Sequence, residues 1–344
     1  MALPTTNTVY TQQSGSILSV AVPVQPTLGP HDVLVRITHS GLCSTDTLYA
    51  TAAPGMALGH EGVGVVDAVG AAVTRFKVGD RAGGGYHRGA CGECSYCLTG
   101  RDIWCYRRVV FGEAGTSIDG ARDEKQNGTL AAWYVGEETF LHRIPDALGS
   151  AEAAPLQCAG ATVYAALRAS VRSPHDRVGI VGIGGVGHLA IQYAAKMGNE
   201  VVVFSTSKDK EAEARRFGAA EFYLADRPED MKEPINTLIV AGRYPNWSKY
   251  LVKEVMARDG IIVPVAAPVL PINLPNGSMF FNGYHVTSSL VASRSTHEDM
   301  LEFSARHGIK PAIETFEMSE KGITEAVEKL KANKMRYRAV LVAP

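Results

Sequence analysis

Residues 177–198 read RVGIVGIGGVGHLAIQYAAKMG, and this stretch decides the fold. Val178–Val181 is a continuous apolar run, which is typical of a strand buried on both faces of a parallel sheet. The pattern G-x-G-x-x-G follows at 182–187, and the residues after it carry the apolar face of a helix that ends at Gly198. A strand, a glycine-rich turn and a helix in this order predict a dinucleotide-binding βαβ unit.

Each residue of the glycine turn has a distinct expected role. Gly182 allows the tight turn, Gly184 lets a pyrophosphate approach the backbone, and Gly187 lets helix and strand pack closely. Gly185 and Val186 lead into the helix, whose free N–H groups and dipole would hold the phosphates. The alternative is a glycine-rich turn that serves packing only.

The end of the next strand indicates which nicotinamide cofactor fits. An NAD site places an Asp or Glu there to accept hydrogen bonds from the ribose 2′-hydroxyl. Here residues 204–210 read FSTSKDK, and Asp209 comes later, where it suits the start of a helix. Without a carboxylate at the strand end, a 2′-phosphate is not repelled, so we expect NADP(H) rather than NAD. The hydroxyls and ammonium groups that could solvate this phosphate belong to Ser205, Thr206, Ser207, Lys208 and Lys210.

Beyond this loop the chain keeps alternating strands and helices. A charged surface helix is expected at 208–217, and apolar runs follow at regular intervals. This alternation predicts a doubly wound parallel sheet. The expected strands are 200–204, 221–224, 236–240 and 260–265.

The parts of the chain before and after this alternating segment have different residue patterns. Residues 1–150 contain short β-branched or alternating runs broken by glycine and proline, so we expect mostly β-structure there. The alanine-rich stretch 151–169 predicts helix. From about Ser293, two amphipathic helices and a last strand, Ala339–Val342, are expected. The predicted β-runs of the first part are 33–37, 62–69 and 131–135.

Composition limits the possible classes of protein. With 344 residues the chain exceeds one ordinary hydrophobic core, so two domains are expected. A net charge of −1 offers no electrostatic basis for binding nucleic acid or an anionic membrane. No apolar run approaches the roughly 20 residues of a membrane helix, and the N-terminal residues do not resemble a signal peptide. Six cysteines are too few for a disulfide scaffold, so we expect a cytoplasmic protein.

Four of the cysteines form a short lobe with the spacing C-x2-C-x2-C-x7-C. They are Cys91, Cys94, Cys97 and Cys105. Four thiolates this close suit a closed, tetrahedral structural zinc site. A disulfide pair and an iron–sulfur cluster are the alternatives, and the last gap with no Cys-Pro after it argues against the cluster.

The remaining ligand-type residues are scattered along the chain. They are Cys43, His60, Glu61 and Cys158. Residues 59–73 contain Gly59-His60-Glu61, then Gly64, Gly70 and Val73, and this resembles the zinc signature G-H-E-x2-G-x5-G-x2-V of the medium-chain alcohol dehydrogenases. The cysteine lobe, the segment 78–81 (VGDR) and the glycine turn follow in that family's order. The segment 41–46 (GLCSTD) and the cofactor loop are most similar to the cinnamyl alcohol dehydrogenase branch.

The resemblance implies an architecture for the whole chain. It implies an α/β two-domain fold that combines a GroES-like β-rich catalytic domain with a Rossmann doubly wound parallel sheet. Residues 1–153 would form the GroES-like domain with the structural zinc lobe, and 154–293 the Rossmann NADP-binding domain. Residues 294–344 would return to the catalytic domain.

The resemblance also implies residue roles. Cys43, His60 and Cys158 would ligate the catalytic zinc, with Glu61 as a fourth or alternating ligand. Asp46 would orient His60, and Thr45 would be the first proton relay. Thr162 would face the nicotinamide side of the cleft, and Arg338 would reach the pyrophosphate.

One position departs from the pattern of many relatives. They carry a His two residues after Asp46, where this chain has Leu48. We therefore expect a slower proton step, most visible below neutral pH during alcohol oxidation. Tyr49, Tyr86 and His87 could line the substrate cleft or could be packing residues.

These features together predict an enzyme with two zinc ions and NADP(H). The expected activity is that of a zinc-dependent alcohol dehydrogenase or aldehyde reductase, with hydride transfer between NADPH and a small-molecule carbonyl substrate. One alternative is a reductase of an activated C=C or iminium in specialised metabolism. The alternative of another class is a catalytically silent structural or binding relative. The segments 260–265 and 282–291 resemble the family's subunit-joining edge, so a homodimer is expected, and a tetramer is possible.

Overall fold

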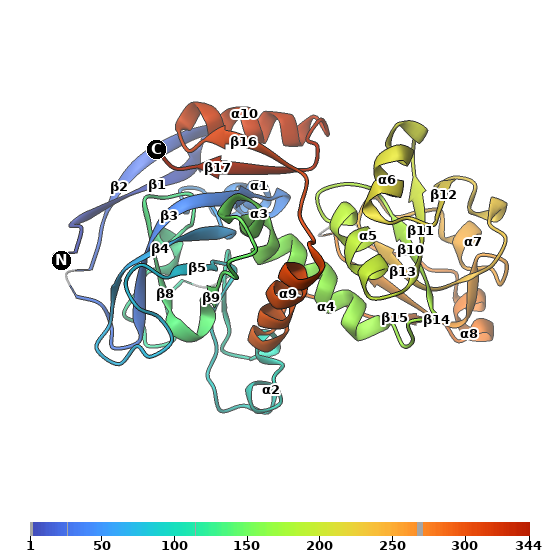
Figure 1. Ribbon diagram of the computed structural model, residues 1–344, viewed down its shortest axis with the longest axis horizontal. Coiled ribbons are helices and arrows are strands. Elements are labelled where there is room, and N and C mark those ends of the chain that lie inside the picture. The colour runs from blue at the N-terminus through green and yellow to red at the C-terminus, as the bar shows by residue number, and fades with distance from the viewer. Residues whose placement is uncertain (1–2, 26, 114, 267–270) are drawn as a thin grey trace. The chain divides into compact units, whose positions relative to one another are not determined.

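The computed structural model describes residues 3–25, 27–113, 115–266 and 271–344, and these divide into two units (Figure 1). The first unit comprises the residues up to Cys158 together with Ala292–Pro344. The second unit is Ala159–Val291. Each unit has its own sheet and its own cluster of buried apolar side chains.

The second unit contains a six-stranded parallel sheet in the order β12-β11-β10-β13-β14-β15. This order, with the first strand of the unit in the middle, confirms the prediction of a doubly wound sheet. The strands are β10 (Arg177–Val181), β11 (Glu200–Ser205), β12 (Glu221–Leu224), β13 (Ile235–Val240), β14 (Met256–Pro264) and β15 (His285–Val286).

Helices connect these strands. α4 packs against α5, and α5 against α6, beside the sheet (Figure 1). The buried face of α5 contains Leu189, Ala190, Tyr193 and Ala194, whose spacing accounts for its apolar periodicity in the sequence. The helices are α4 (Ala161–Ser170), α5 (Gly187–Lys196), α6 (Glu211–Phe217), α7 (Trp247–Tyr250) and α8 (Asn276–Asn282), with short 3-10 turns at Lys208–Lys210 and Pro228–Asp230.

The first unit is built on a mostly antiparallel sheet in the order β16-β17-β3-β4-β5-β9, with β8 also paired to β3. The long strand β3 lies at its centre and pairs with β17, β4 and β8. The first unit also contains a β1–β2 hairpin and a small β6–β7 pair. The strands are β1 (Thr6–Gln13), β2 (Ser16–Pro23), β3 (Asp32–Leu42), β4 (Gly62–Val69), β5 (Arg81–Gly84), β6 (His87–Gly89), β7 (Val109–Val110), β8 (Trp133–Glu137), β9 (His142–Arg143), β16 (Ile313–Glu317) and β17 (Arg338–Val342).

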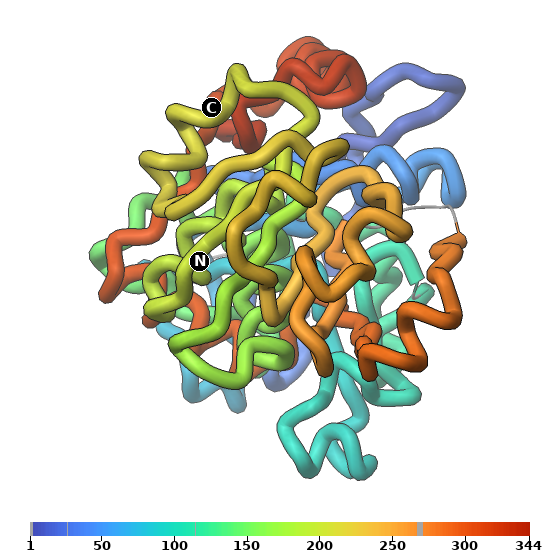
Figure 2. Tube along the Cα trace, turned by 90° about the vertical axis from the view of Figure 1, so that its right-hand side faces the viewer, coloured from blue at the N-terminus to red at the C-terminus, as the bar shows by residue number. Residues whose placement is uncertain are grey.

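The helices of the first unit come from both ends of the chain. α10 packs against β2 and β16, so the C-terminal segment completes the core of this unit. The helices are α1 (Ser44–Ala52), α2 (Ser95–Leu98), α3 (Ser150–Pro155), α9 (Arg294–His307) and α10 (Glu320–Lys331), with 3-10 turns at Asp102–Trp104, Glu124–Gln126 and Glu138–Phe140. The cysteine lobe around α2, drawn in cyan, projects from the rest of this unit in both views (Figure 2).

The helix expected over 151–169 is interrupted. α3 ends at Pro155, a π-helical turn covers Leu156–Gly160, and α4 begins at Ala161. Proline cannot donate the backbone hydrogen bond that an α-helix needs, which accounts for a change of helical type here. π-turns inside helical segments are frequent at functional sites, and this one contains Cys158.

Candidate active site and structural metal centre

Four potential metal ligands from distant parts of the sequence meet inside the first unit. One ligand atom each from Cys43, His60, Glu61 and Cys158 lies within 4.8 Å of all the others, and all four residues are buried. Cys43 stands between β3 and α1, the His60-Glu61 pair directly precedes β4, and Cys158 lies in the π-helical turn. Because β3 and β4 pair side by side, the first three ligands are brought together by the sheet itself.

The Asp46 carboxylate orients this group, as the resemblance implied. Asp46 Oδ1 lies 3.1 Å from His60 Nδ1, and it accepts a hydrogen bond of 2.8 Å from the Gly59 N–H. Its Oδ2 accepts a 2.9 Å bond from the Cys43 N–H. One buried carboxylate on α1 therefore fixes the backbone beside two ligands and the ring of one of them.

The other ring nitrogen of His60 is free to bind a metal ion. His60 is 0% exposed, and its Nε2 has no hydrogen-bond partner among the described residues. A buried polar atom without a partner is costly unless a ligand satisfies it. Two thiols, an imidazole nitrogen and a carboxylate form a donor set that suits Zn²⁺, so the residues present fit this ion.

The two thiols of the group are electrostatically linked. A hydrogen bond from Cys158, opposed by burial and supported by His60 and Arg338, lowers the pKa of Cys43 well below its usual value. A metal ion binds the thiolate form of cysteine, so this environment favours ligation at Cys43.

Glu61 is held by Arg338, which lies on β17. Arg338 Nη2 lies 2.5 Å from Glu61 Oε2 and also bonds Oε1, while Oε1 is 3.9 Å from His60 Nε2. Burial raises the pKa of Glu61 to about 7, although the guanidinium opposes this shift. Gly41 makes room for this carboxylate, because a Cβ there would lie 2.0 Å from Glu61 Oε2. The expected contact of Arg338 with a pyrophosphate stays a prediction.

Thr45 stands at the edge of the group. Its Oγ1 lies 3.5 Å from Cys43 Sγ, and the residue is half-buried. Leu48, one turn later on α1, is 39% exposed. The threonine hydroxyl therefore lies beside one of the ligand thiols.

Aromatic rings surround His60, and no sequence pattern identified Phe111, the ring that packs most closely on it. Phe111 is fully buried and stacks on the imidazole with ring centroids 4.6 Å apart, and Tyr86 meets it edge-on at 5.7 Å. Tyr49 contacts the edge of Phe111 at 5.7 Å. His87 does not belong to this group, since its ring packs against Phe140 at 4.8 Å. No spacing rule marks Phe111, so only the fold reveals its position.

The four lobe cysteines form a second, separate group. Their ligand atoms all lie within 4.8 Å of one another, and all six cysteines of the chain are free, so the disulfide alternative is wrong. Cys94 and Cys97 sulfurs are 3.6 Å apart, and those of Cys91 and Cys105 are 3.5 Å apart. These separations are close to the edge of about 3.8 Å in a tetrahedron with Zn–S bonds of 2.3 Å. The N–H of Cys91 donates to Cys105 Sγ over 3.4 Å.

The predicted glycine turn lies at the carboxyl end of β10. Gly182 has φ +92°, which favours glycine, and a Cβ on Gly187 would lie 1.9 Å from the Gly182 carbonyl oxygen. A Cβ on Gly184, by contrast, would have nothing within 4 Å. Gly187 therefore serves packing, and Gly184 leaves open space beside the backbone, as the two roles require. Gly185 and Val186 complete the turn before α5 begins.

The loop after β11 leads back toward this turn. Lys210 Nζ donates a 3.0 Å hydrogen bond to the carbonyl of Ile183, inside the glycine turn. Asp209 accepts a hydrogen bond from the Ser207 hydroxyl. Ser205 is buried at the strand end, whereas Thr206, Ser207 and Lys208 are exposed; Thr162 is buried in the first turn of α4.

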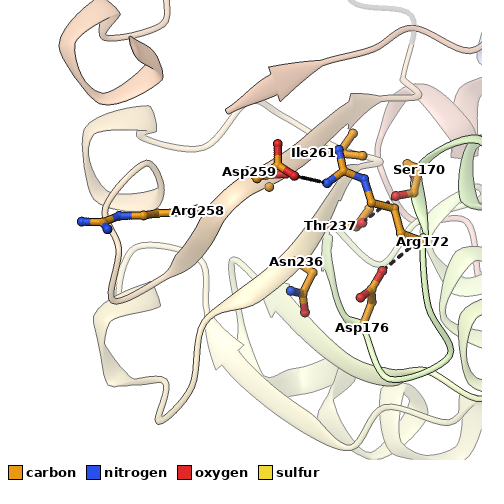
Figure 3. A pocket seen from close by; sticks show the side chains of 9 residues that line it. Ser170, Arg172, Asp176, Asn236, Thr237, Arg258, Asp259 and Ile261 are labelled. Carbon is orange, nitrogen blue, oxygen red and sulfur yellow. Dashed lines mark hydrogen bonds and ion pairs between the residues drawn. The ribbon is translucent and has the colours of Figure 1, made fainter. Parts of the chain in front are cut away.

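A pocket of about 220 Å³ elsewhere in the second unit is not a second candidate (Figure 3). It lies near the amino ends of β10 and β13, whereas ligands of such sheets bind beyond the carboxyl ends. Its two carboxylates are already engaged, since the Arg172 guanidinium binds Asp259 and the Arg172 backbone N–H donates to Asp176 over 2.8 Å. The lining residues are Ser170, Arg172, Asp176, Asn236, Thr237, Arg258, Asp259, Gly260 and Ile261.

Comparisons with known proteins show the family of this chain. Residues 29–146 match the family model for the alcohol dehydrogenase GroES-like domain, and residues 185–306 match the model for zinc-binding dehydrogenases. A probable formaldehyde dehydrogenase of Bacillus subtilis is 36% identical over 327 residues, which cover 91% of this chain and 90% of the relative. NADP-dependent alcohol dehydrogenase C 1 of Mycolicibacterium smegmatis is 34% identical over 322 residues, covering 91% of each.

Solved structures show the same relationship. A cinnamyl alcohol dehydrogenase of Sorghum bicolor superposes with a TM-score of 0.89 at 30% identity, over 98% of this chain and 97% of that one. A cinnamyl alcohol dehydrogenase of Helicobacter pylori, solved with NADP(H), gives 0.86 at 26% identity over 99% of both chains. Among the described residues, no helix is both long and apolar enough to cross a membrane. With the ligand group, the cysteine lobe and the glycine turn all present, this chain belongs to the zinc-dependent medium-chain alcohol dehydrogenases, in their cinnamyl alcohol dehydrogenase-like branch.

Proposed function

We propose that this protein is an NADPH-dependent aldehyde reductase, working as a zinc alcohol dehydrogenase on a small-molecule substrate. The observation that carries the proposal is the buried group of Cys43, His60 and Cys158, with the free Nε2 of His60 aimed into it. A chain that had become a silent binding protein would have no reason to keep this costly arrangement. A zinc ion bound there would supply Lewis acidity toward the substrate oxygen.

The chain's own residues then have defined tasks. Asp46 keeps the His60 ring in the orientation that leaves Nε2 free, and the carboxylate of Glu61 stays near that nitrogen through its bonds to Arg338. The Thr45 hydroxyl, beside Cys43, would exchange the proton of the substrate hydroxyl. Buried surroundings strengthen these electrostatic interactions relative to water.

The proposed cofactor preference rests on the loop after β11. Thr206, Ser207 and Lys208 are exposed there, and Lys210 lies against the glycine turn. A relative whose name states NADP dependence and a similar structure in complex with NADP(H) support the same choice. Thr206→Asp would place a carboxylate at the strand end, so we expect kcat/KM with NADPH to fall at least about tenfold. The ratio of kcat/KM with NADPH to kcat/KM with NADH should fall as well. Thr206→Asn is the matched neutral control, and an unchanged ratio in the Asp variant would contradict the assignment.

The central experiment combines metal analysis with an aldehyde panel assayed with NADPH and NADH. The parent protein should carry two zinc ions per chain and reduce aldehydes with NADPH. Cys43→Ala should keep the lobe zinc and the fold, lose the other zinc and lose turnover. If Cys43→Ala turns over aldehydes at the parent's rate, the proposal is wrong. A homodimer and a cytoplasmic location stay predictions.

A further inference from the structure

Phe111 ties the metal-binding imidazole to a buried charge. Its ring stacks on His60 with a centroid distance of 4.6 Å and an interplanar angle of 30°. The guanidinium carbon of Arg88 lies 5.2 Å from the centroid of the same Phe111 ring. Arg88 is only 4% exposed, so this contact between a cation and a ring lies out of water, where it is strongest.

Arg88 also supports the backbone beside His60. Its Nε donates a 2.7 Å hydrogen bond to the carbonyl of Gly85. A Cβ on Gly85 would lie 2.9 Å from the carbonyl carbon of His60, so the glycine backbone packs directly on the ligand's own backbone. The guanidinium therefore contacts two neighbours of His60. Phe111 packs on the His60 ring, and Gly85 packs on the His60 main chain.

Glu124 keeps Arg88 in this place. Arg88 Nη1 donates to the Glu124 carbonyl over 2.9 Å and to Oε2 over 3.2 Å. Glu124 is 3% exposed, and its carboxylate also accepts bonds from Arg122 at 2.7 Å and Asn127 at 3.0 Å. The position of the Arg88 side chain is thus determined from both sides.

The geometry favours ring contact over complete hydrogen bonding. Arg88 Nη2 is buried and finds no hydrogen-bond partner in the part of the chain that the structure describes, while its guanidinium lies over the rings of Phe111 and Tyr134. Burying an ion pair is expensive, and apolar side chains of similar volume would fill this space at lower cost. The pair is therefore poorly explained as a source of stability alone.

We propose that the Arg88–Glu124 pair positions His60 through Phe111. In this way the pair sets how tightly zinc is held by the first metal centre, which is the group of Cys43, His60, Glu61 and Cys158. The inference rests on the zinc centre of the proposed function. Groups that orient a metal ligand without touching the metal typically change metal affinity 10- to 100-fold when they are altered. Arg88 is thus a positioning residue and takes no direct part in the chemistry.

The test measures zinc release from the holoprotein to a chromophoric chelator. Arg88→Lys keeps the charge but loses the planar group that covers the ring, so one zinc equivalent should leave about 10 to 100 times faster than in the parent. Release of the other equivalent, from the cysteine lobe, should be unchanged. Phe111→Leu should have the same selective effect, and the double variant should be no worse than the stronger single variant, because both changes break one chain of contacts.

Arg177→Lys is the matched control. Arg177 is also a buried arginine, 7% exposed and paired with Glu200 and Glu221, but it belongs to the second unit. This variant should keep the parent's release rates for both zinc ions. If Arg88→Lys does not fold, Glu124→Gln takes its place with the same expected result.

The outcomes separate the possible errors. Three outcomes would overturn the inference and leave the proposed function intact. Arg88→Lys could release zinc at the parent's rate, both zinc ions could leave equally faster, or the effects of the two changes could multiply in the double variant. A purified parent that binds only the lobe zinc would overturn the proposed function and this inference together. With Co²⁺ in the first centre, shifted visible absorption bands in Arg88→Lys would show directly that the ligand geometry has changed.

Discussion

At the scale of single residues, the proposed proton route from the group of Cys43, His60, Glu61 and Cys158 involves α1. Thr45 Oγ1 lies 3.5 Å from Cys43 Sγ, and the next turn presents Leu48, whose side chain has no polar atom. Position 48 therefore offers no side-chain base.

Leu48→His should accelerate alcohol oxidation below neutral pH. An exposed imidazole with a pKa near 6.5 can accept a proton there, and a gain of about tenfold in kcat at pH 6 is a modest share of what general bases supply. The measurement is the pH profile of kcat in the oxidative direction. Leu48→Gln, which is polar but does not titrate in this range, should follow the parent, and an unchanged profile for Leu48→His would refute the idea.

Two glycines of the same turn should respond differently to alanine. A Cβ on Gly187 would lie 1.9 Å from the Gly182 carbonyl oxygen, so Gly187→Ala should reduce the free energy of unfolding by about 1–3 kcal/mol. Gly184 has space for a Cβ in the protein alone, so Gly184→Ala should keep its stability but bind NADPH at least about tenfold more weakly. Urea unfolding and fluorescence titration with NADPH measure the two effects. Normal cofactor affinity in Gly184→Ala would show that the pyrophosphate does not approach there.

At the scale of elements, α9 joins the first unit through buried histidines. His297 on α9 stacks on His142 of β9 with centroids 3.9 Å apart, and its Nε2 lies 3.1 Å from Gln157 Oε1. His87 of β6 is buried nearby, with Nδ1 4.0 Å from Asp102 Oδ1. The charged groups that face these rings are Asp102, paired with Arg294, and Glu298, paired with Arg75.

These histidines predict a loss of stability in mild acid. Burial lowers the pKa of His87 to about 4. Burial also lowers the pKa of His297 well below its usual value, and the neighbouring His142 lowers it further. The unfolded chain binds protons below about pH 6.5 while these native rings stay neutral, so the free energy of unfolding falls between pH 6.5 and 4. His87 alone would account for about 3 kcal/mol at the lower end of this range.

Removing one of these rings should flatten the pH dependence. In urea unfolding at pH 7 and pH 5, His297→Gln should lose about 1–2 kcal/mol less than the parent between the two values. His175→Gln changes an exposed histidine and should behave like the parent. A pH dependence in His297→Gln as steep as the parent's would contradict the role of the cluster.

At the scale of the whole molecule, the two units should respond separately to their ligands. Their apolar clusters share no residue, and each unit has a sheet of its own. Calorimetry should show that NADPH raises the transition of the second unit, with a stabilisation of about 2.7 kcal/mol at 100 times its Kd. Zinc removal by a chelator should lower the transition of the first unit. A single transition that both treatments shift equally would show that the units unfold together.

Much of this protein follows from short-range features of its sequence. The strand–turn–helix of 177–198 and the alternation after it were predicted with their order, because burial periodicity and glycine placement act within a few residues. The spacing of the cysteine lobe likewise predicted a closed group, because its four thiols are near one another in the chain. For the ligands in the first unit, the predicted set came from a family resemblance.

Long-range contacts decided the rest. The pairing of β17 and β4 with β3 brings Arg338 and Glu61 together, and no local pattern could have shown that this arginine binds the carboxylate. The stacking of Phe111 on His60 above Arg88 depends in the same way on segments that meet only in the folded sheet. The sequence by itself therefore determined the elements and their candidate chemistry, because these depend on neighbours along the chain. Apart from Asp46, whose contact with His60 the resemblance implied, tertiary structure alone decided which side chains hold these ligands in place, because those contacts form only when distant strands pair and bury them.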